Sequence, residues 1–266
     1  MAWTAFPYPD PAFRYTPETL QAAWPHLHGG DREAFPSHPA LVQAWIAFHA
    51  GEFERAARLG LDVGVNGYAV AHKAICIYTT YLEPSDKRRL ATFECVAERC
   101  ERQQLEQPGN PAGYYWHAYA LGQYAQGISV VKALAQGLGT RIKRSLDIAI
   151  KLEPQRADAH IALGVYHAEI LDKAGAVLAG LTYGCRKEEA YRQFELGMQL
   201  NPDSAIARIQ YARALLMLDK KNRLAQARDL YEQAACCNVR DATERLDQEA
   251  AQQALEEEKL GGSVVK

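Results

Sequence analysis

The clearest candidates for nucleophilic chemistry are Ser129 with Lys132 and the adjacent thiols Cys236 and Cys237. Ser-x-x-Lys is the nucleophile-and-base spacing of serine acyl enzymes, and paired thiols suit redox or arsenical chemistry. The companion triplets Ser-Asp-Asn and Lys-Thr-Gly are absent from the chain. Adjacent cysteines on a helix point about 100° apart, which favours one in the core and one at its rim. An enzyme using Ser129 or the thiols is therefore the last of three hypotheses, and no catalytic residue is predicted.

Histidines offer a second kind of chemistry, metal binding. His26 and His28, with His38 further on, could share an ion, but no carboxylate or thiolate is indicated to complete the site. The pattern therefore favours surface histidines beside a proline-rich turn. His160 and His167 lie seven residues apart and share a helix face, where packing or partner contact is favoured over a metal. The sequence predicts no metal site and no cofactor.

Other signatures are missing. There is no Gly-x4-Gly-Lys-Ser/Thr loop, no Gly-x-Ser-x-Gly elbow, no His-Glu-x-x-His and no Cys-x-x-Cys. The formal net charge of −2 excludes an attraction of the chain as a whole to nucleic acid or to an anionic membrane surface. Residues 107–131 carry no charge but include polar residues and glycines, which indicates a buried helix and no membrane span. With six sparse cysteines and no secretory leader over residues 1–39, we expect a cytoplasmic protein with reduced thiols.

The elements that position these residues follow a repeat. Leu-Gly-Gln-Tyr at 121–124 recurs 42 positions later as Leu-Gly-Val-Tyr at 163–166. The turn prolines Pro111, Pro154 and Pro202 are 43 and 48 positions apart, and each is expected to start a helix. Between them, Ala190, Phe194, Gly197 and Pro202 have the spacing of the second helix of a tetratricopeptide repeat, in which small residues let two helices approach closely.

Earlier segments continue the pattern of paired helices. We expect helices over 41–50 and 68–81, followed by partners from 53 and over 87–104, with Ser85 as an N-cap. The predicted fold is an all-α, tetratricopeptide-repeat-like (TPR-like) α-solenoid of about five helical hairpins plus a C-terminal capping helix. The predicted parts are an N-terminal Pro/aromatic arm with a short helix (1–36), the helical repeat domain (37–240), and the capping helix and tail (241–266), which opens with the capping-box pattern Asp241-x-x-Glu244.

Residues 111–218 resemble a TPR protein with long inter-helix turns, because the unit runs 42 to 48 residues against about 34 for the standard repeat. The motif at 163–166, with Ala-Glu-Ile at 168–170 and Leu-Thr-Tyr-Gly at 181–184, is similar to the regulator of microtubule dynamics family. It also resembles the T component of bacterial tripartite (TRAP) transporters. Both resemblances imply a helical scaffold that performs no catalysis.

Function is predicted from the surface that such a fold offers. The first helix of each pair should line a concave groove, which gives His117, Leu121, Tyr124, Ile161, Val165, Arg208 and Tyr211. We expect a non-catalytic protein–protein interaction scaffold that binds a partner peptide or helix there. The alternative is a small-molecule or lipid carrier or sensor whose long turns, around 127–139 and 172–184, enclose an apolar pocket.

Three questions stay open at this point. The apolar segment 174–184 is expected to plug the solenoid interior, and the alternative is a binding loop for a partner helix or an acyl chain. The N-terminal arm, residues 2–15, is expected to pack on the solenoid, which leaves open whether it occupies the groove. Neither the identity of the partner nor the oligomeric state follows from the sequence.

Overall fold

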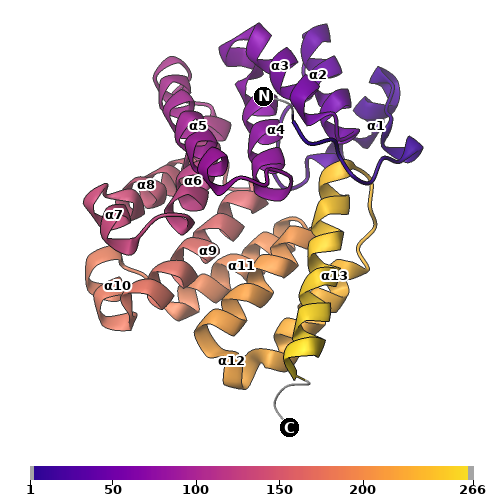
Figure 1. Ribbon diagram of the computed structural model, residues 1–266. Helices are drawn as coiled ribbons and strands as arrows, with labels where there is room; N and C mark the ends of the chain where they lie inside the picture. The colour runs from indigo at the N-terminus through magenta and orange to yellow at the C-terminus, as the bar shows by residue number, and fades with distance from the viewer. Residues whose placement is uncertain (1–2, 263–266) are drawn as a thin grey trace. The chain divides into compact units, whose positions relative to one another are not determined.

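The computed structural model describes residues 3–262, with no side-chain detail from 258 onward (Figure 1). Over that range the chain forms thirteen α-helices and no strand. The helices are α1 (Pro17–Leu27), α2 (Pro39–His49), α3 (Phe53–Val63), α4 (Tyr68–Tyr81), α5 (Asp86–Glu106), α6 (Pro111–Gln126), α7 (Val130–Ala135), α8 (Leu138–Leu152), α9 (Ala157–Ala174), α10 (Ala176–Tyr183), α11 (Lys187–Leu200), α12 (Ala205–Ala235) and α13 (Ala242–Gly262). None of the described helices is both long enough and apolar enough to cross a membrane.

The chain divides into two compact units. Unit 1 holds the residues up to Ala159 together with Asp241–Thr243, and unit 2 holds His160–Arg240 and the residues from Glu244 onward. The predicted boundaries near residues 36 and 240 stay a prediction. The first boundary between the two compact units falls within the opening turn of α9.

Unit 1 contains three helical hairpins, α2 with α3, α4 with α5, and α6 with α8. The predicted helix over 68–81 matches α4, and Ser85 caps α5 by accepting a hydrogen bond from the backbone N–H of Arg88. Asn110 caps α6 in the same way, and Pro111 occupies the first turn. Local capping chemistry therefore sets these helix starts, as the sequence predicts.

The N-terminal arm packs on unit 1. The ring of Trp3 lies 4.1 Å from that of Tyr78, whose hydroxyl accepts a hydrogen bond from the backbone N–H of Thr4. Phe6 contacts Phe53 edge-on, with ring centroids 6.1 Å apart. The expectation of an arm packed on the helices is thus confirmed, since these aromatic side chains bury area that a free tail would leave in water.

Unit 2 continues the pattern of pairs. Most of α9 packs against α11, and α12 is divided by non-helical backbone at Asp219 (φ −160°, ψ 45°) into two arms that form one more hairpin. The prediction that proline starts each helix is wrong here. Pro154 and Pro202 lie in the preceding turns, three residues before α9 and α12 begin. Ser204 caps α12, because its hydroxyl accepts a hydrogen bond from the backbone N–H of Ala207.

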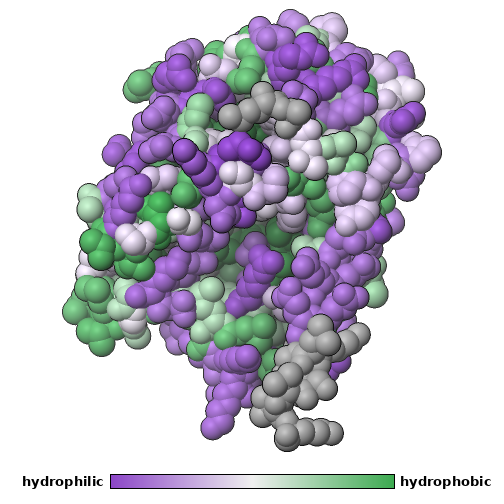
Figure 2. All heavy atoms as spheres, viewed as in Figure 1, coloured by the Kyte–Doolittle hydropathy of each residue, from purple (hydrophilic) through white to green (hydrophobic). Residues whose placement is uncertain are grey.

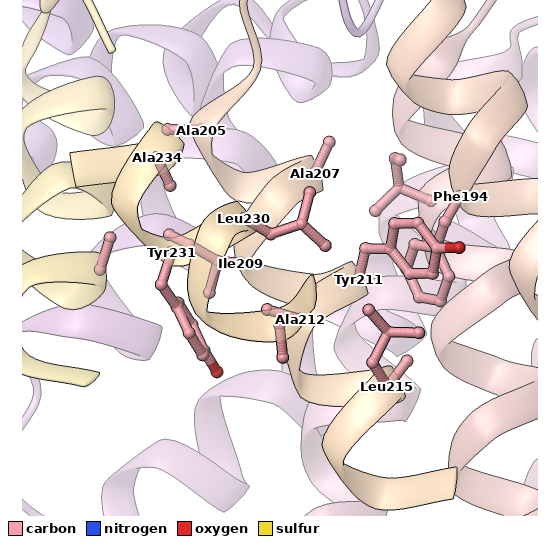
Figure 3. Packing of buried hydrophobic residues seen from close by; sticks show 14 of the residues in the cluster. Phe194, Ala205, Ala207, Ile209, Tyr211, Ala212, Leu215, Leu230, Tyr231 and Ala234 are labelled. Carbon is pink, nitrogen blue, oxygen red and sulfur yellow. The ribbon is translucent and has the colours of Figure 1, made fainter. Parts of the chain in front are cut away.

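The core of unit 2 shows why small residues recur. Phe194 is fully buried, and a Cβ atom on Gly164 would lie only 2.9 Å from its ring, so only glycine admits this approach of α9 to α11. Phe194 also stacks on Tyr211, with centroids 5.0 Å apart (Figure 3). Phe194, which the sequence places in a close-packed second helix, therefore forms the contact that joins these helices, and its small partner across the interface is Gly164.

The long turns within two hairpins each fold into a short helix. α7 lies between α6 and α8 in unit 1, and α10 lies between α9 and α11 in unit 2. The expectation that α10 plugs the interior is wrong. Ala179 is buried, but Val177 and Leu181 are 77% and 85% exposed. An eight-residue helix has few side chains, and the tilt that buries Ala179 leaves the opposite face in solvent.

Candidate functional site

The predicted groove residues of unit 1 lie on α6 and are buried. His117, Leu121 and Tyr124 each expose 5% of their surface or less. Nδ1 of His117 is 2.8 Å from the Ser145 hydroxyl on α8, and Nε2 is 3.4 Å from a carboxylate oxygen of Glu101 on α5. Burial lowers the pKa of His117, against the opposing charge of Glu101. These side chains join α6 to its neighbours.

In unit 2 the predicted groove residues divide into two groups. Ile161 and Tyr211 are buried in the hydrophobic core, and burial beside Glu195 raises the pKa of Tyr211 to about 12. Val165 and Arg208 are only partly buried. Arg208 donates hydrogen bonds to the carbonyls of Pro202 and Ser204, at 2.6 and 2.9 Å, so its guanidinium braces the turn before α12.

Five of the seven predicted residues therefore serve as core packing, and their role in binding a partner stays a prediction. The sequence pattern gives the helix face but not the depth to which neighbouring helices cover it. Large aromatics next to small residues are drawn into the contact between helices, because close approach removes their apolar area from water.

The structure reveals a buried ionic network in unit 1 that sequence reasoning missed. Nδ1 of His28 lies 2.8 Å from Asp31, the Nε2 atoms of His28 and His49 lie 3.3 Å apart, and Nδ1 of His49 lies 2.7 Å from Asp241. Lys73 donates to the other oxygen of Asp31 at 2.6 Å. The expectation that His28 is a surface histidine is wrong, because it is 3% exposed and stacks on Trp24.

The three contacts among the histidines and carboxylates constrain where the hydrogens of this network lie. Each contact needs one hydrogen between its two heavy atoms, which an imidazole N–H or a protonated carboxyl group can supply. Burial lowers the pKa of His28 to about 4, which favours its neutral form as the acceptor at Nε2. The Lys73 ammonium faces the carboxylate of Asp31 at 2.6 Å, and this pairing offsets the cost of burying the two charges in low dielectric.

Electrostatic shifts around Asp31 follow from this balance. Burial by itself raises the pKa of Asp31, but its contact with His28 and the charge of Lys73 outweigh this effect and hold the pKa well below its usual range. Burial raises the pKa of Asp158 to about 6, and Asp31 adds to the effect. Arg156 is almost completely buried, lies 3.4 Å from Glu33 and covers the ring of Tyr115 at 5.0 Å. The network is mostly buried, with only Lys73 and Glu33 partly exposed, and it links the ends of α1 and α2 to α4 and to the residue before α13.

The predicted nucleophiles have structural roles. Ser129 is the N-cap of α7, and its hydroxyl accepts a hydrogen bond from the backbone N–H of Lys132 at 3.2 Å, which accounts for their spacing. Cys236 and Cys237 are not on a helix as expected, since α12 ends at Ala235. Among the side chains that the structure describes, no group of three or more His, Cys, Asp or Glu is arranged to hold a metal ion.

A buried thiol is the other group with potential reactivity. Sγ of Cys100 lies 3.3 Å from Nδ1 of His72, which is the contact of a thiol–imidazole pair. Burial raises the pKa of Cys100 well above its usual value and lowers that of His72 to about 3. Both groups are therefore neutral near pH 7, whereas a catalytic pair needs a thiolate.

The architecture is that of an all-α, TPR-like helical repeat. No protein-family model matches the chain, and no curated protein matches it either. Among solved structures it is similar to TTC0263, a thermophilic TPR protein of Thermus thermophilus, with a TM-score of 0.57 and 15% sequence identity over 80% of this chain and 97% of that one. This likeness confirms the predicted fold, and the comparisons support neither of the two more specific families.

Proposed function

We propose that this protein is a non-catalytic interaction scaffold that binds a protein segment on its helical repeats. The observation that carries the proposal is the TPR-like fold, matched over nearly the whole of a TPR protein. Stacked helical hairpins leave one face of each first helix uncovered, which is the surface such repeats offer to extended or helical peptides. The neutral, buried Cys100–His72 pair and the capping role of Ser129 agree with a protein without nucleophilic chemistry.

The surface we assign is the partly exposed face of α9 in unit 2. Ala162, Val165 and Glu169 are spaced three and four residues apart, so they share one side of the helix, and each is only partly buried. Val165 is the predicted groove residue at the centre of this stripe. The alternative function, a carrier with an apolar pocket enclosed by the long turns, gains no support, since α7 and α10 each turn aliphatic side chains to solvent.

The test compares Val165→Glu with Leu105→Glu, which makes the same change at an 83% exposed apolar residue of α5. Each variant is checked by circular dichroism and then used as bait in native extract, with chemical cross-linking and mass spectrometry. We expect specific partners to be lost from Val165→Glu and retained by Leu105→Glu. Retention of the same proteins by both folded variants, or no specific protein on the wild type, would overturn the proposal.

A further inference from the structure

The apolar face of α10 is the most exposed hydrophobic surface of unit 2. Val177, Leu178 and Leu181 are all exposed, and their spacing places them on one side of the helix. Figure 2 shows hydrophobic atoms gathered over this helix. The helix is anchored from below, because Ala179 is fully buried and its carbonyl accepts a hydrogen bond from the backbone N–H of Cys185 at 3.0 Å. The three aliphatic side chains are therefore held outward.

A group of basic side chains from two helices is named here the basic corner: Arg186, Lys187, Lys220, Lys221 and Arg223. The first two open α11, and the other three open the second arm of α12. Lys187 and Arg223 both lie over the ring of Tyr191, at 5.7 and 5.8 Å, which brings the two helix starts together.

Acidic side chains offset this positive charge only in part. Asp219 pairs with Lys187 at 2.9 Å, and Glu188 and Glu189 lie in the first turn of α11, where Glu189 pairs with Arg192. The five basic groups of the corner therefore outnumber these three acidic ones. No acidic residue occurs between Lys173 and Lys187, the stretch that contains α10. Lys220, Lys221 and Arg223 are exposed. The local charge thus differs in sign from the net charge of the whole chain, and within a Debye length of about 8 Å the local charge decides the attraction.

We propose that α10 and the basic corner form a docking surface for an anionic lipid bilayer, on which unit 2 binds peripherally. Aliphatic side chains on a protruding helix can enter the soft interfacial region of a bilayer, whereas a rigid protein partner would need a matching cavity. The basic corner supplies attraction to anionic headgroups, each cation adding to the binding. Three aliphatic side chains give weak binding by themselves, so attachment requires anionic lipid and weakens with salt.

Unit 1 carries a comparable insert at the same position of a hairpin. In α7, Val130, Val131 and Leu134 are exposed, with Lys132 among them. No acidic residue occurs between Glu106 and Asp147, whereas four basic residues do. Insertions in helical repeats are common binding elements, and two hairpins here carry short helical inserts with exposed aliphatic side chains.

The test is co-sedimentation of the full chain with vesicles. We expect binding to vesicles of phosphatidylcholine with phosphatidylserine at low salt, and little binding to phosphatidylcholine alone. Val177→Ser with Leu181→Ser should lower the partition coefficient about tenfold. Lys220→Glu with Lys221→Glu should lower it about tenfold or more. The matched controls, Leu105→Ser for the first pair and Arg58→Glu with Arg102→Glu for the second, should bind like the wild type.

Several results would overturn this proposal. The first is equal binding of the wild type to vesicles with and without phosphatidylserine, and the second is no sedimentation with either kind. The third is that the α10 variant and the basic-corner variant both bind as well as the wild type. Binding of a labelled Leu/Glu amphipathic peptide in place of vesicles, lost in the corner variant, would assign the surface to an acidic protein segment instead. The proposal is independent of the scaffold function, because the bilayer surface does not include Val165. The Val165→Glu variant should therefore bind vesicles like the wild type.

Discussion

Replacement of Asp31 by asparagine tests the buried network directly. The side chain keeps its size but loses its negative charge and one of its two acceptor oxygens. Lys73 at 2.6 Å and Nδ1 of His28 at 2.8 Å therefore cannot both keep an oxygen acceptor. Asp31 is almost completely buried, so no water replaces the lost charge. Removing one partner of a buried ion pair costs about 3–5 kcal/mol, which is a large part of the roughly 5–15 kcal/mol that stabilises a typical domain.

Tryptophan fluorescence during urea unfolding is the suitable assay, because all four tryptophans, Trp3, Trp24, Trp45 and Trp116, belong to unit 1. The variant should unfold at lower urea with an unchanged slope. Glu52→Gln is the control, since its ion pair with Arg55 is half exposed and should contribute less than about 1 kcal/mol.

A double variant separates charge balance from packing. Asp31→Asn with Lys73→Met removes both charges, so it should be more stable than Asp31→Asn alone, although it changes more atoms. A loss for Asp31→Asn no larger than that of Glu52→Gln would refute the reasoning. A double variant whose loss equals the sum of the two single losses would show that the two charges do not interact.

Three further predictions concern pH, packing and thiol reactivity. Because burial lowers the pKa of His28 to about 4 and of His72 to about 3, the unfolded chain binds more protons below pH 6.5. The free energy of unfolding of unit 1 should therefore fall between pH 7 and pH 4.5, by up to about 1.4 kcal/mol per pH unit for each histidine, and the urea midpoint should fall with it; a constant midpoint would contradict the burial of both. Phe194→Ala should destabilise unit 2 by about 3–5 kcal/mol, as followed by circular dichroism, with a smaller loss for Phe194→Leu; equal losses would show that the ring is not packed. In native protein, iodoacetamide should modify the exposed Cys236 and spare Cys100 until urea is added, as peptide mass spectrometry can show; early modification of Cys100 would mean that it is accessible.

Periodicity predicted the helices because their signals are local. The turns, the Ser85 cap and the range of α4 follow from residues within a few positions of one another. The small-to-aromatic spacing around Phe194 likewise predicted which faces meet, since its repeat in sequence is the repeat of the contact. The groove was harder to predict, because exposure of a helix face depends on how far the next helices cover it, and Tyr211 is covered.

The sequence by itself determined an all-α, TPR-like repeat and its paired helices, because helix starts and hydrophobic faces are written at short range. Only the tertiary structure decided that His28, His49 and Asp241 form one network, since residues 21 and 192 positions apart carry no local signal of their contact. It also decided that α10 presents Val177 and Leu181 to solvent. Burial depends on which elements a segment packs against, and no period in the sequence records that choice.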